Sequence, residues 1–158
     1  MFQQLYGLEF VALRYFNVFG PRQDPGSAYS GVLSLFNAAL LNRTQPTVYG
    51  DGLQSRDFVF VGNVVEAILL AAGEKQAAGH AFNIGTGNRY TLNQTLSLLE
   101  KITGRPAKAK YVGSREGDIR DSQANIALAK NLLGYSPHIG FEESLKHTWD
   151  WFSSNKSA

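Results

Sequence analysis

Two arginines lie in polar loops of this 158-residue sequence, where their guanidinium groups could bind an anionic ligand. Arg56 follows the polar turn 50–55 at the start of a predicted strand, and Arg115 lies in the glycine-containing loop 113–118. A planar guanidinium donates two parallel hydrogen bonds to phosphate oxygens, so both arginines suit a phosphate-bearing ligand. An ordinary surface ion pair with a nearby acid is the alternative interpretation for each of them.

Asn17 is the third candidate, because it stands near the end of the most apolar segment of the chain. A buried amide must find hydrogen-bond partners. Ligands of α/β proteins bind in the crevice at the carboxyl ends of parallel strands. A structural role and a ligand contact therefore both remain open for Asn17.

Other chemistries find no support in the sequence. It has no cysteine, which excludes thiol catalysis, and its histidines, at positions 80, 138 and 147, lack metal-ligand spacing. No nucleophile elbow and no Tyr-x-x-x-Lys pair occurs, so no catalytic residue and no metal site are predicted. The turn 85–87 begins like a dinucleotide fingerprint, but Tyr90 stands at its last glycine position. We interpret it as a tight strand-to-helix turn that needs a positive φ.

The composition places the chain among ordinary globular domains. Hydrophobic residues make up 44% and charged residues 18%, which fits one domain. The 15 basic and 13 acidic residues nearly balance, without a run of like charges, and this argues against nucleic-acid binding. No apolar window of about 18 residues predicts a membrane span. Since no apolar leader follows Met1, we expect a cytoplasmic protein.

Strands and helices that alternate along the chain must position these residues, and they predict an α/β protein. The expected strands cover residues 9–19, 47–49, 57–61, 81–84 and 109–112. The expected helices begin at Ser30, Asn63, Thr91 and Asn125, and a last one carries the aromatic stripe 141–152. Asn63 and Glu66 have capping-box spacing, followed by the apolar stripe of an amphipathic helix, Val65, Ile68, Leu69 and Ala72.

Four segments together resemble a known family. They are, in order, LRYFNVFGPRQ (13–23), YGDGLQSRDFVFV (49–61), FNIGTG (82–87) and REGD (115–118). They closely resemble the C-terminal half of the NAD-dependent nucleotide-sugar epimerases and dehydratases, in the extended short-chain dehydrogenase/reductase family. Residues 22–25 and 29–32 look most like the UDP-glucose 4-epimerase type. The resemblance implies that residues 1–158 form the C-terminal, substrate-binding portion of an extended Rossmann-type epimerase, with short strands and about five helices.

The resemblance implies that four polar residues contact the substrate. Asn17, Arg56 and Arg115 fall where the family contacts the diphosphate or its neighbouring sugar. Asp118 matches a position that accepts hydrogen bonds from the nucleotide ribose. This agrees with the anionic ligand that the two arginines suggest by themselves.

Four further positions are implied by the same resemblance. Thr47 and Tyr49 match the base pocket, where an aromatic ring packs against uracil, and Val32 matches a ligand-lining position on a helix. Phe16 falls where the chain approaches the nicotinamide end of NAD. The family's N-terminal glycine fingerprint and catalytic Tyr-x-x-x-Lys have no counterpart here, so the chain is expected to be a fragment that binds no NAD alone.

The predicted function is therefore that of the UDP-hexose-binding half of an NAD-dependent sugar 4-epimerase, inactive alone. A dehydratase or decarboxylase fragment of the same family and a non-catalytic nucleotide-sugar-binding or scaffold module are the alternatives. Residues 9–19 are patterned for burial on both faces, and an unpaired strand edge invites association. We expect a homo-oligomer or pairing with an N-terminal half as partner, and no nucleic acid or membrane.

Overall fold

The computed structural model describes residues 5–27 and 29–155, which fold as an α/β protein. Its strands are β1 (Ala12–Tyr15), β2 (Asn17–Phe19), β3 (Thr47–Tyr49), β4 (Ser55–Arg56), β5 (Phe58–Phe60), β6 (Ala81–Ile84), β7 (Tyr90–Thr91) and β8 (Lys110–Val112). The helices with bounds inside the described residues are α2 (Val32–Leu41), α3 (Val61–Gly73), α4 (Leu92–Thr103), α5 (Ala127–Leu133) and α6 (Phe141–Ser154). The predicted class, with short strands and about five helices, is confirmed.

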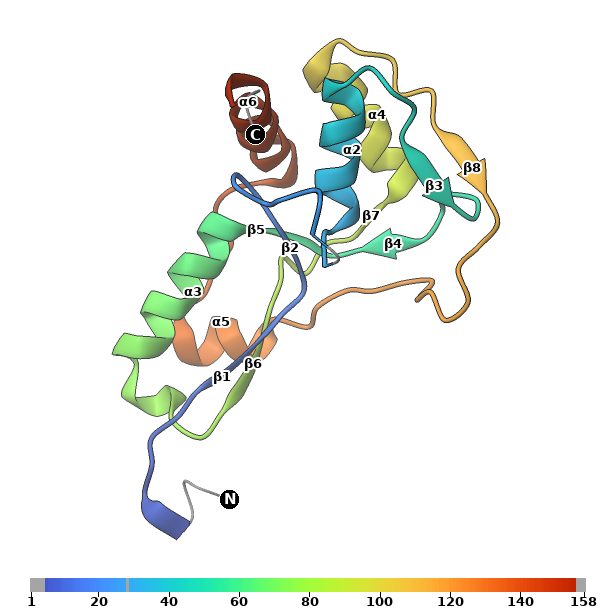
Figure 1. Cartoon of the computed structure of the whole chain (residues 1–158). Coiled ribbons are helices and arrows are strands. Elements are labelled where there is room, and N and C mark those ends of the chain that lie inside the picture. The colour runs from blue at the N-terminus through green and yellow to red at the C-terminus, as the bar shows by residue number, and fades with distance from the viewer. Residues whose placement is uncertain (1–4, 28, 156–158) are drawn as a thin grey trace.

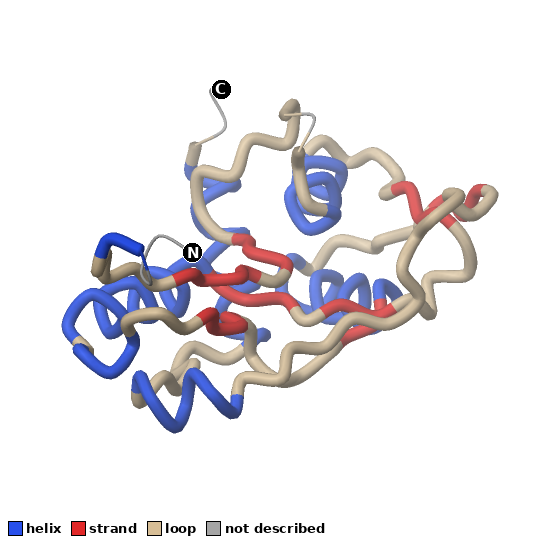
Figure 2. The backbone as a smooth tube through the Cα atoms, turned by 90° about the horizontal axis from the view of Figure 1, so that it is seen from below, coloured by secondary structure: helices blue, strands red, loops and turns tan. Residues whose placement is uncertain are grey.

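The short strands pair two by two, and most pairs are parallel. β1 pairs with β6, β2 with β5 and β3 with β8 in parallel, whereas β4 and β7 are antiparallel. Most of the strands run through the middle of the molecule with helices on both sides (Figure 2), whereas β3 and β8 lie at one edge (Figure 1). This is the layered arrangement that an alternating α/β sequence produces.

The single strand expected over 9–19 is interrupted at Phe16. The Phe16 amide donates to the Ile84 carbonyl at 3.0 Å, and the next amide, that of Asn17, donates to the Asp57 carbonyl at 3.1 Å. Successive amides of an extended chain point to opposite edges. The segment therefore exchanges one neighbour, β6, for another, β5, within a single residue.

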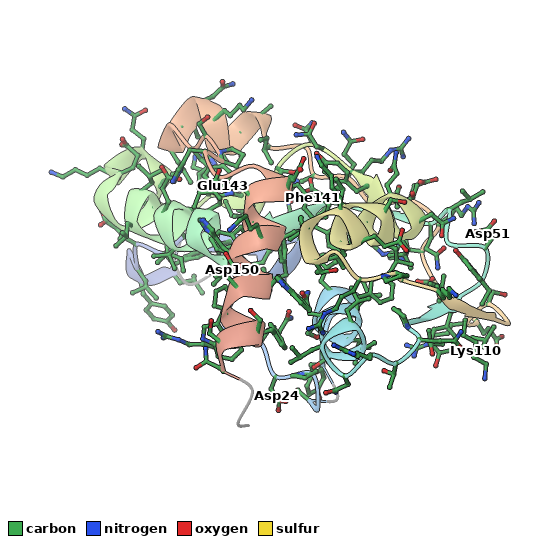
Figure 3. All side chains as sticks on the ribbon, turned by 90° about the horizontal axis from the view of Figure 1, so that it is seen from above. Asp24, Asp51, Lys110, Phe141, Glu143 and Asp150 are labelled. Carbon is green, nitrogen blue, oxygen red and sulfur yellow. The ribbon has the colours of Figure 1, made fainter. Side chains whose placement is uncertain are left out.

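Two groups of buried side chains form the core. The first lies where α2, α4 and α6 meet β2 and β5, at the opposite end of the molecule from the second, between α3, α5, β1 and β6 (Figure 1). Phe141, at the start of α6 (Figure 3), stacks on Phe58 with ring centroids 5.5 Å apart, so the aromatic stripe 141–152 packs in the core. β5 belongs to both groups, because Phe58 and Phe60 enter the first and Val59 the second.

The ends of several helices differ from the predictions by one or two residues. α2 begins at Val32, not at Ser30, and α5 begins at Ala127, where the Asn125 carboxamide oxygen accepts the first helical amide at 3.0 Å. The predicted helix start at Thr91 is confirmed, because Thr91 caps α4 and forms a capping box with Gln94.

The predicted capping role of Asn63 is wrong, because α3 already begins at Val61. Asn63 lies inside the helix with its side chain fully buried. Its amide donates to the Ile139 carbonyl at 3.0 Å, and its oxygen accepts from the Ile139 amide at 3.2 Å. The Asn63 side chain therefore binds a residue 76 positions away in the sequence and does not cap its own helix.

The apolar stripe of α3 faces outward. α3 buries Val64, Ala67 and Ala71 against the second core group. Its more apolar residues remain largely exposed, and we call them the α3 stripe: Val65, Ile68, Leu69 and Ala72. The helix therefore has two apolar faces, and the structure packs the face with the smaller side chains.

A buried carboxylate fixes the glycine turn that follows β6. Asp57 accepts hydrogen bonds from the Thr86 amide and hydroxyl, both at 2.8 Å, and from the amides of Gly87 at 2.9 Å and Ala124 at 3.0 Å. Gly87 has φ +75°, as predicted for a tight turn, and Gly85 packs close to Ala124. Asp57 thereby joins three segments that lie far apart in the sequence.

Replacing Gly85 with alanine is expected to destabilise the protein. The added Cβ would lie 2.6 Å from the Ala124 Cβ and 2.9 Å from an Asp57 carboxylate oxygen, so the backbone must shift. We expect the free energy of unfolding to fall by about 1–3 kcal/mol in urea denaturation. Gly113→Ala is the matched control, because its Cβ would meet nothing within 4 Å. Equal stability of the two variants would contradict this close packing.

Alkaline pH should destabilise the protein through Tyr135. This buried side chain donates from its hydroxyl to the Gly85 carbonyl at 2.9 Å. Burial, with the charges of Asp57 and Glu66 nearby, raises the pKa of Tyr135 far above its ordinary value. The unfolded state then loses the proton from about pH 10 upward while the folded state keeps it, so stability falls as pH rises.

The contribution of Tyr135 is isolated by comparison with Tyr135→Phe. Up to about 1.4 kcal/mol per pH unit should be lost in the parent protein above pH 10 through this one group. Urea unfolding at pH 9 and pH 11 measures the slope, which should be shallower in the phenylalanine variant. Identical slopes in the two proteins would show that Tyr135 ionises as easily when folded.

No helix of the described residues is long and apolar enough to cross a membrane. Within residues 5–27 and 29–155, no three or more His, Asp or Glu side chains gather in a way that could hold a metal ion.

Candidate nucleotide-sugar site

One cavity of about 220 Å³ gathers all seven positions that sequence analysis assigned to substrate. The elements around it are α2, β2, β3 and β4, which meet beside the loop after β8 (Figure 1). The predicted residues that line it are Asn17, Val32, Thr47, Tyr49, Arg56, Arg115 and Asp118. They come from five separate segments of the chain, which only the fold brings together.

Strand geometry explains how β3 and β4 present their side chains. Thr47 and Tyr49 are exposed and line the cavity, whereas Val48 between them is fully buried in the core. Alternate residues of a strand point to opposite faces. Arg56 ends β4, where it pairs with Tyr90 of β7.

Arg56 is the best-enclosed charge of the cavity. Its side chain is 15% exposed, and its guanidinium donates to the Asp118 carboxylate at 2.5 Å and to the Ser55 carbonyl at 2.8 Å. The ion pair that sequence analysis held open as an alternative is therefore present, and its acid is another predicted site residue. A guanidinium has five N–H donors, so these two bonds leave donor capacity for a ligand in the cavity.

Arg115 contacts an aromatic ring. The central carbon of its guanidinium lies 3.9 Å from the centroid of the Tyr49 ring, a cation–π contact. One face of the predicted base-stacking ring is thus occupied by a cation. Arg115 comes from the loop after β8, whereas Arg56 belongs to β4. The two positive groups and the single carboxylate of Asp118 give the cavity lining an excess of positive charge.

The loop that carries Arg115 and Asp118 is tied to β4 and to the turn before it. Arg120 donates two hydrogen bonds to the Asp51 carboxylate, at 2.8 and 3.1 Å, and these bonds hold the pKa of Asp51 below its usual value. The Ser55 amide donates to the Arg120 carbonyl at 2.9 Å, and the Ser55 hydroxyl donates to Asp121 at 2.5 Å. Asp51 lies at the same end of the molecule as Lys110 of β8 (Figure 3).

Asn17 has the structural role that its sequence position left open, and it also lines the cavity. Its side-chain amide donates to the Asp57 carbonyl at 3.2 Å, which joins β2 to β5. The residue is half-buried and lies at the start of β2, one residue after Phe16. A structural bond therefore fixes a side chain of the cavity lining.

Four lining residues were not predicted: Ser30, Leu35, Gln54 and Leu92. Gln54 is buried and donates to the Tyr49 carbonyl at 2.6 Å, so it connects the chain on either side of the turn. It precedes Arg56 by two residues, and the alternation of an extended segment places both on one side. The two-residue alternation of strands, applied to Arg56 in the 49–61 motif, could therefore have predicted that Gln54 lines the same cavity.

The described residues do not form a dinucleotide site at the glycine turn. A pyrophosphate would need free backbone amides there. The Thr86 and Gly87 amides already donate to the Asp57 carboxylate at 2.8 and 2.9 Å, and this negative charge would repel phosphate. Phe16, the position assigned to the nicotinamide end of NAD, is half-buried between β1 and β2 and does not line the 220 Å³ cavity.

The fold and the site define a class of protein that comparison with known proteins identifies. Residues 1–85 match the NAD dependent epimerase/dehydratase family, and the chain belongs to that family. The predicted resemblance is therefore confirmed, including its correspondence to the C-terminal half.

Three relatives show the extent of the similarity. The chain is 34% identical to the UDP-glucose 4-epimerase of Mycolicibacterium smegmatis over 99% of its own length and 49% of the relative's. The UDP-glucose 4-epimerase of Thermotoga maritima, solved with UDP-glucose, is 40% identical with a TM-score of 0.93, over 99% of this chain and 50% of that one. The Thermus thermophilus enzyme, solved with NAD, is 33% identical with a TM-score of 0.88, over 98% and 50%. The chain thus spans about half the length of the relatives it matches.

Proposed function

We propose that this chain binds the UDP-sugar, most specifically a UDP-hexose, of an NAD-dependent 4-epimerase. One observation carries the proposal: seven positions assigned by motif line a single cavity that holds two arginines. A relative with a TM-score of 0.93 is a UDP-glucose 4-epimerase solved with UDP-glucose, which supports the ligand class.

The side chains of the cavity suit the parts of such a ligand. Arg56 and Arg115 would donate to the diphosphate, since charge-assisted guanidinium bonds to phosphate are strong. Asp118 would accept from the ribose hydroxyls, and the exposed face of Tyr49 would pack against the base. The cavity of about 220 Å³ is smaller than the roughly 300–1,000 Å³ of typical ligand sites, so other walls must complete it.

This half would anchor the nucleotide while the chemistry occurs beside it. NAD, when bound by the full-length relatives, supplies the hydride transfer at the sugar. The proposed contribution of the described residues is to bind and orient the nucleotide, because none of the cavity residues is a Tyr-Lys acid/base pair. The chain alone is therefore expected to bind UDP-sugar but not NAD.

Calorimetric titration tests the proposal directly. UDP and UDP-glucose should bind, and uridine, which has the same base and ribose but no phosphate, should bind at least about tenfold more weakly. NAD should give no binding heat. Equal affinities for UDP and uridine, or no binding of either, would refute the anion site and leave a scaffold role for the chain.

The proposed lack of activity has its own test. The chain incubated with NAD and UDP-glucose should produce no UDP-galactose, whereas addition of the complementary half of a relative should restore interconversion. Epimerase activity of the chain alone would contradict the proposal.

A further inference from the structure

A second cavity lies between the ends of α2 and α4. Both helices end on the same side of the molecule, where loops lead on to β3 and β8 (Figure 1). The cavity has a volume of about 480 Å³, within the roughly 300–1,000 Å³ of typical ligand sites. Its lining comes from segments 40–45 and 104–108, and none of its residues lines the cavity of about 220 Å³. It is therefore a separate space in which a ligand could bind.

The charged side chains of this lining are all cations. They are Arg43, Arg105 and Lys108, and we call the space the basic cavity. None of the three forms an ion pair with another described residue, whereas Arg56 in the smaller cavity pairs with Asp118. Cations of one sign that line a cavity raise the local concentration of anions.

Arg105 is fixed in the cavity wall and keeps free donors. Its Nη1 atom donates to the carbonyls of Leu40 and Leu41, at 2.7 and 3.0 Å. Its guanidinium also lies 5.0 Å from the ring centroid of Trp149, a cation–π contact. A guanidinium has five N–H donors, and those on Nε and Nη2 donate to no described group. A planar group held in this way suits the oxygens of a phosphate.

Arg43 has a backbone conformation that favours glycine. α2 ends in a Schellman motif, in which the Thr44 amide donates to the Ala39 carbonyl at 2.8 Å and the Arg43 amide to the Leu40 carbonyl at 3.3 Å. Arg43 has φ +55° in this motif, whereas the end of α4 has Gly104 with φ +64°. A non-glycine residue in this region is strained, and such strain is concentrated at ligand sites.

The negative ends of the two helices do not account for all of these charges. A cation near the C-terminus of a helix is stabilising by itself. Arg105 complements the end of α2 in this way, and Lys101 lies in the last turn of α4. Glu100, the acid of that turn, accepts a backbone amide at 2.5 Å and does not line the cavity. Arg43 and Lys108 therefore remain as cations without a structural partner among the described residues.

We propose that the basic cavity is a second anion site, which binds the diphosphate group of a small molecule. Three cations suit a ligand with more than one negative charge, and Leu40 and Pro106 add an apolar wall for an organic part. The cations come from two short segments and form no continuous track, which favours a small ligand over a nucleic acid. The inference goes beyond the proposed function, because the two cavities share no lining residue.

Calorimetry tests the basic cavity in a chain with a weakened first site. Pyrophosphate is titrated into the full chain with Arg56→Ala, which removes the better-enclosed cation of the smaller cavity. One molecule should bind per chain, and inorganic phosphate should bind at least about tenfold more weakly, because it reaches fewer cations. ADP should bind at least as tightly as pyrophosphate if the ligand is organic, and more weakly if it is inorganic. Titration of the parent with UDP tests the first site independently.

Matched glycine substitutions locate the pyrophosphate. In the same background, Arg43→Gly should weaken its binding at least about fivefold. The melting temperature should not fall, because glycine suits φ +55°. Arg22→Gly is the control, since Arg22 is also exposed and has φ +68° but lines a different cavity. It should bind pyrophosphate as the background does. Lys108→Gln should weaken binding as Arg43→Gly does.

Three results would overturn the proposal. They are no binding of pyrophosphate to the Arg56→Ala chain, equal affinities of the Arg43→Gly and Arg22→Gly variants, and tighter binding of a short adenylate RNA than of pyrophosphate. The last result would assign the cations to a nucleic acid instead.

Discussion

Replacing Arg56 with alanine is expected to raise the dissociation constant for UDP at least about 30-fold. Arg56 is mostly enclosed, and the substitution removes charge-assisted donors to the phosphates. Truncation of a largely buried hydrogen-bonded charge costs about 2–5 kcal/mol, and about 1.4 kcal/mol corresponds to tenfold in affinity. Asp118 also loses its partner at 2.5 Å, which leaves a carboxylate to repel the ligand.

Two further variants separate the effect of charge from that of geometry. Arg56→Lys keeps the charge but loses the planar pair of donors, so it should recover only part of the affinity. Arg43→Ala is the control, because Arg43 is an exposed arginine that lines a different cavity. Calorimetry with UDP checks all three, and an Arg56→Ala variant that binds as tightly as Arg43→Ala would remove Arg56 from the site.

Replacing Asp57 with alanine is expected to lower the free energy of unfolding by about 3–5 kcal/mol, the largest loss in stability that we predict. The substitution leaves the amides of Thr86, Gly87 and Ala124 without the carboxylate that accepts from them. Each buried donor without a partner costs about 1–3 kcal/mol.

The control for Asp57→Ala is the same substitution at a solvent-exposed aspartate. Asp150 pairs with Lys146 one turn away on α6 and is exposed, so Asp150→Ala should cost less than about 1 kcal/mol. Urea denaturation of both variants measures the difference. A loss for Asp57→Ala as small as that for Asp150→Ala would show that water replaces the carboxylate.

The site could be predicted from the sequence more completely than the surroundings that hold it. Thr47 and Tyr49 alternate around buried Val48 in a local pattern that the sequence displays, and both line the cavity. Arg56 and Asp118 both lie in the family motifs. Nothing in the sequence indicates that they contact each other across 62 positions. The motifs thus point to residues that line one cavity, and folding alone determines which of them touch.

The parts that sequence analysis missed depend on distant partners. The sequence pattern predicts only that Asp57 begins a strand. Its carboxylate accepts hydrogen bonds from amides 29 to 67 residues away, which no local pattern indicates. The α3 stripe was taken for an ordinary amphipathic pattern, since periodicity shows that a helix has an apolar face but not which of two faces is covered.

The position of β5 between the two core groups has a consequence for how the protein melts. Phe58 and Phe60 leave the first group if the strand detaches, and Val59 leaves the second at the same moment. Neither core group can lose β5 and keep its own packing, so the two halves of the molecule that surround these groups are not independent folding units. Heat or denaturant should therefore unfold the described chain in one cooperative transition, with fluorescence and circular dichroism midpoints that coincide.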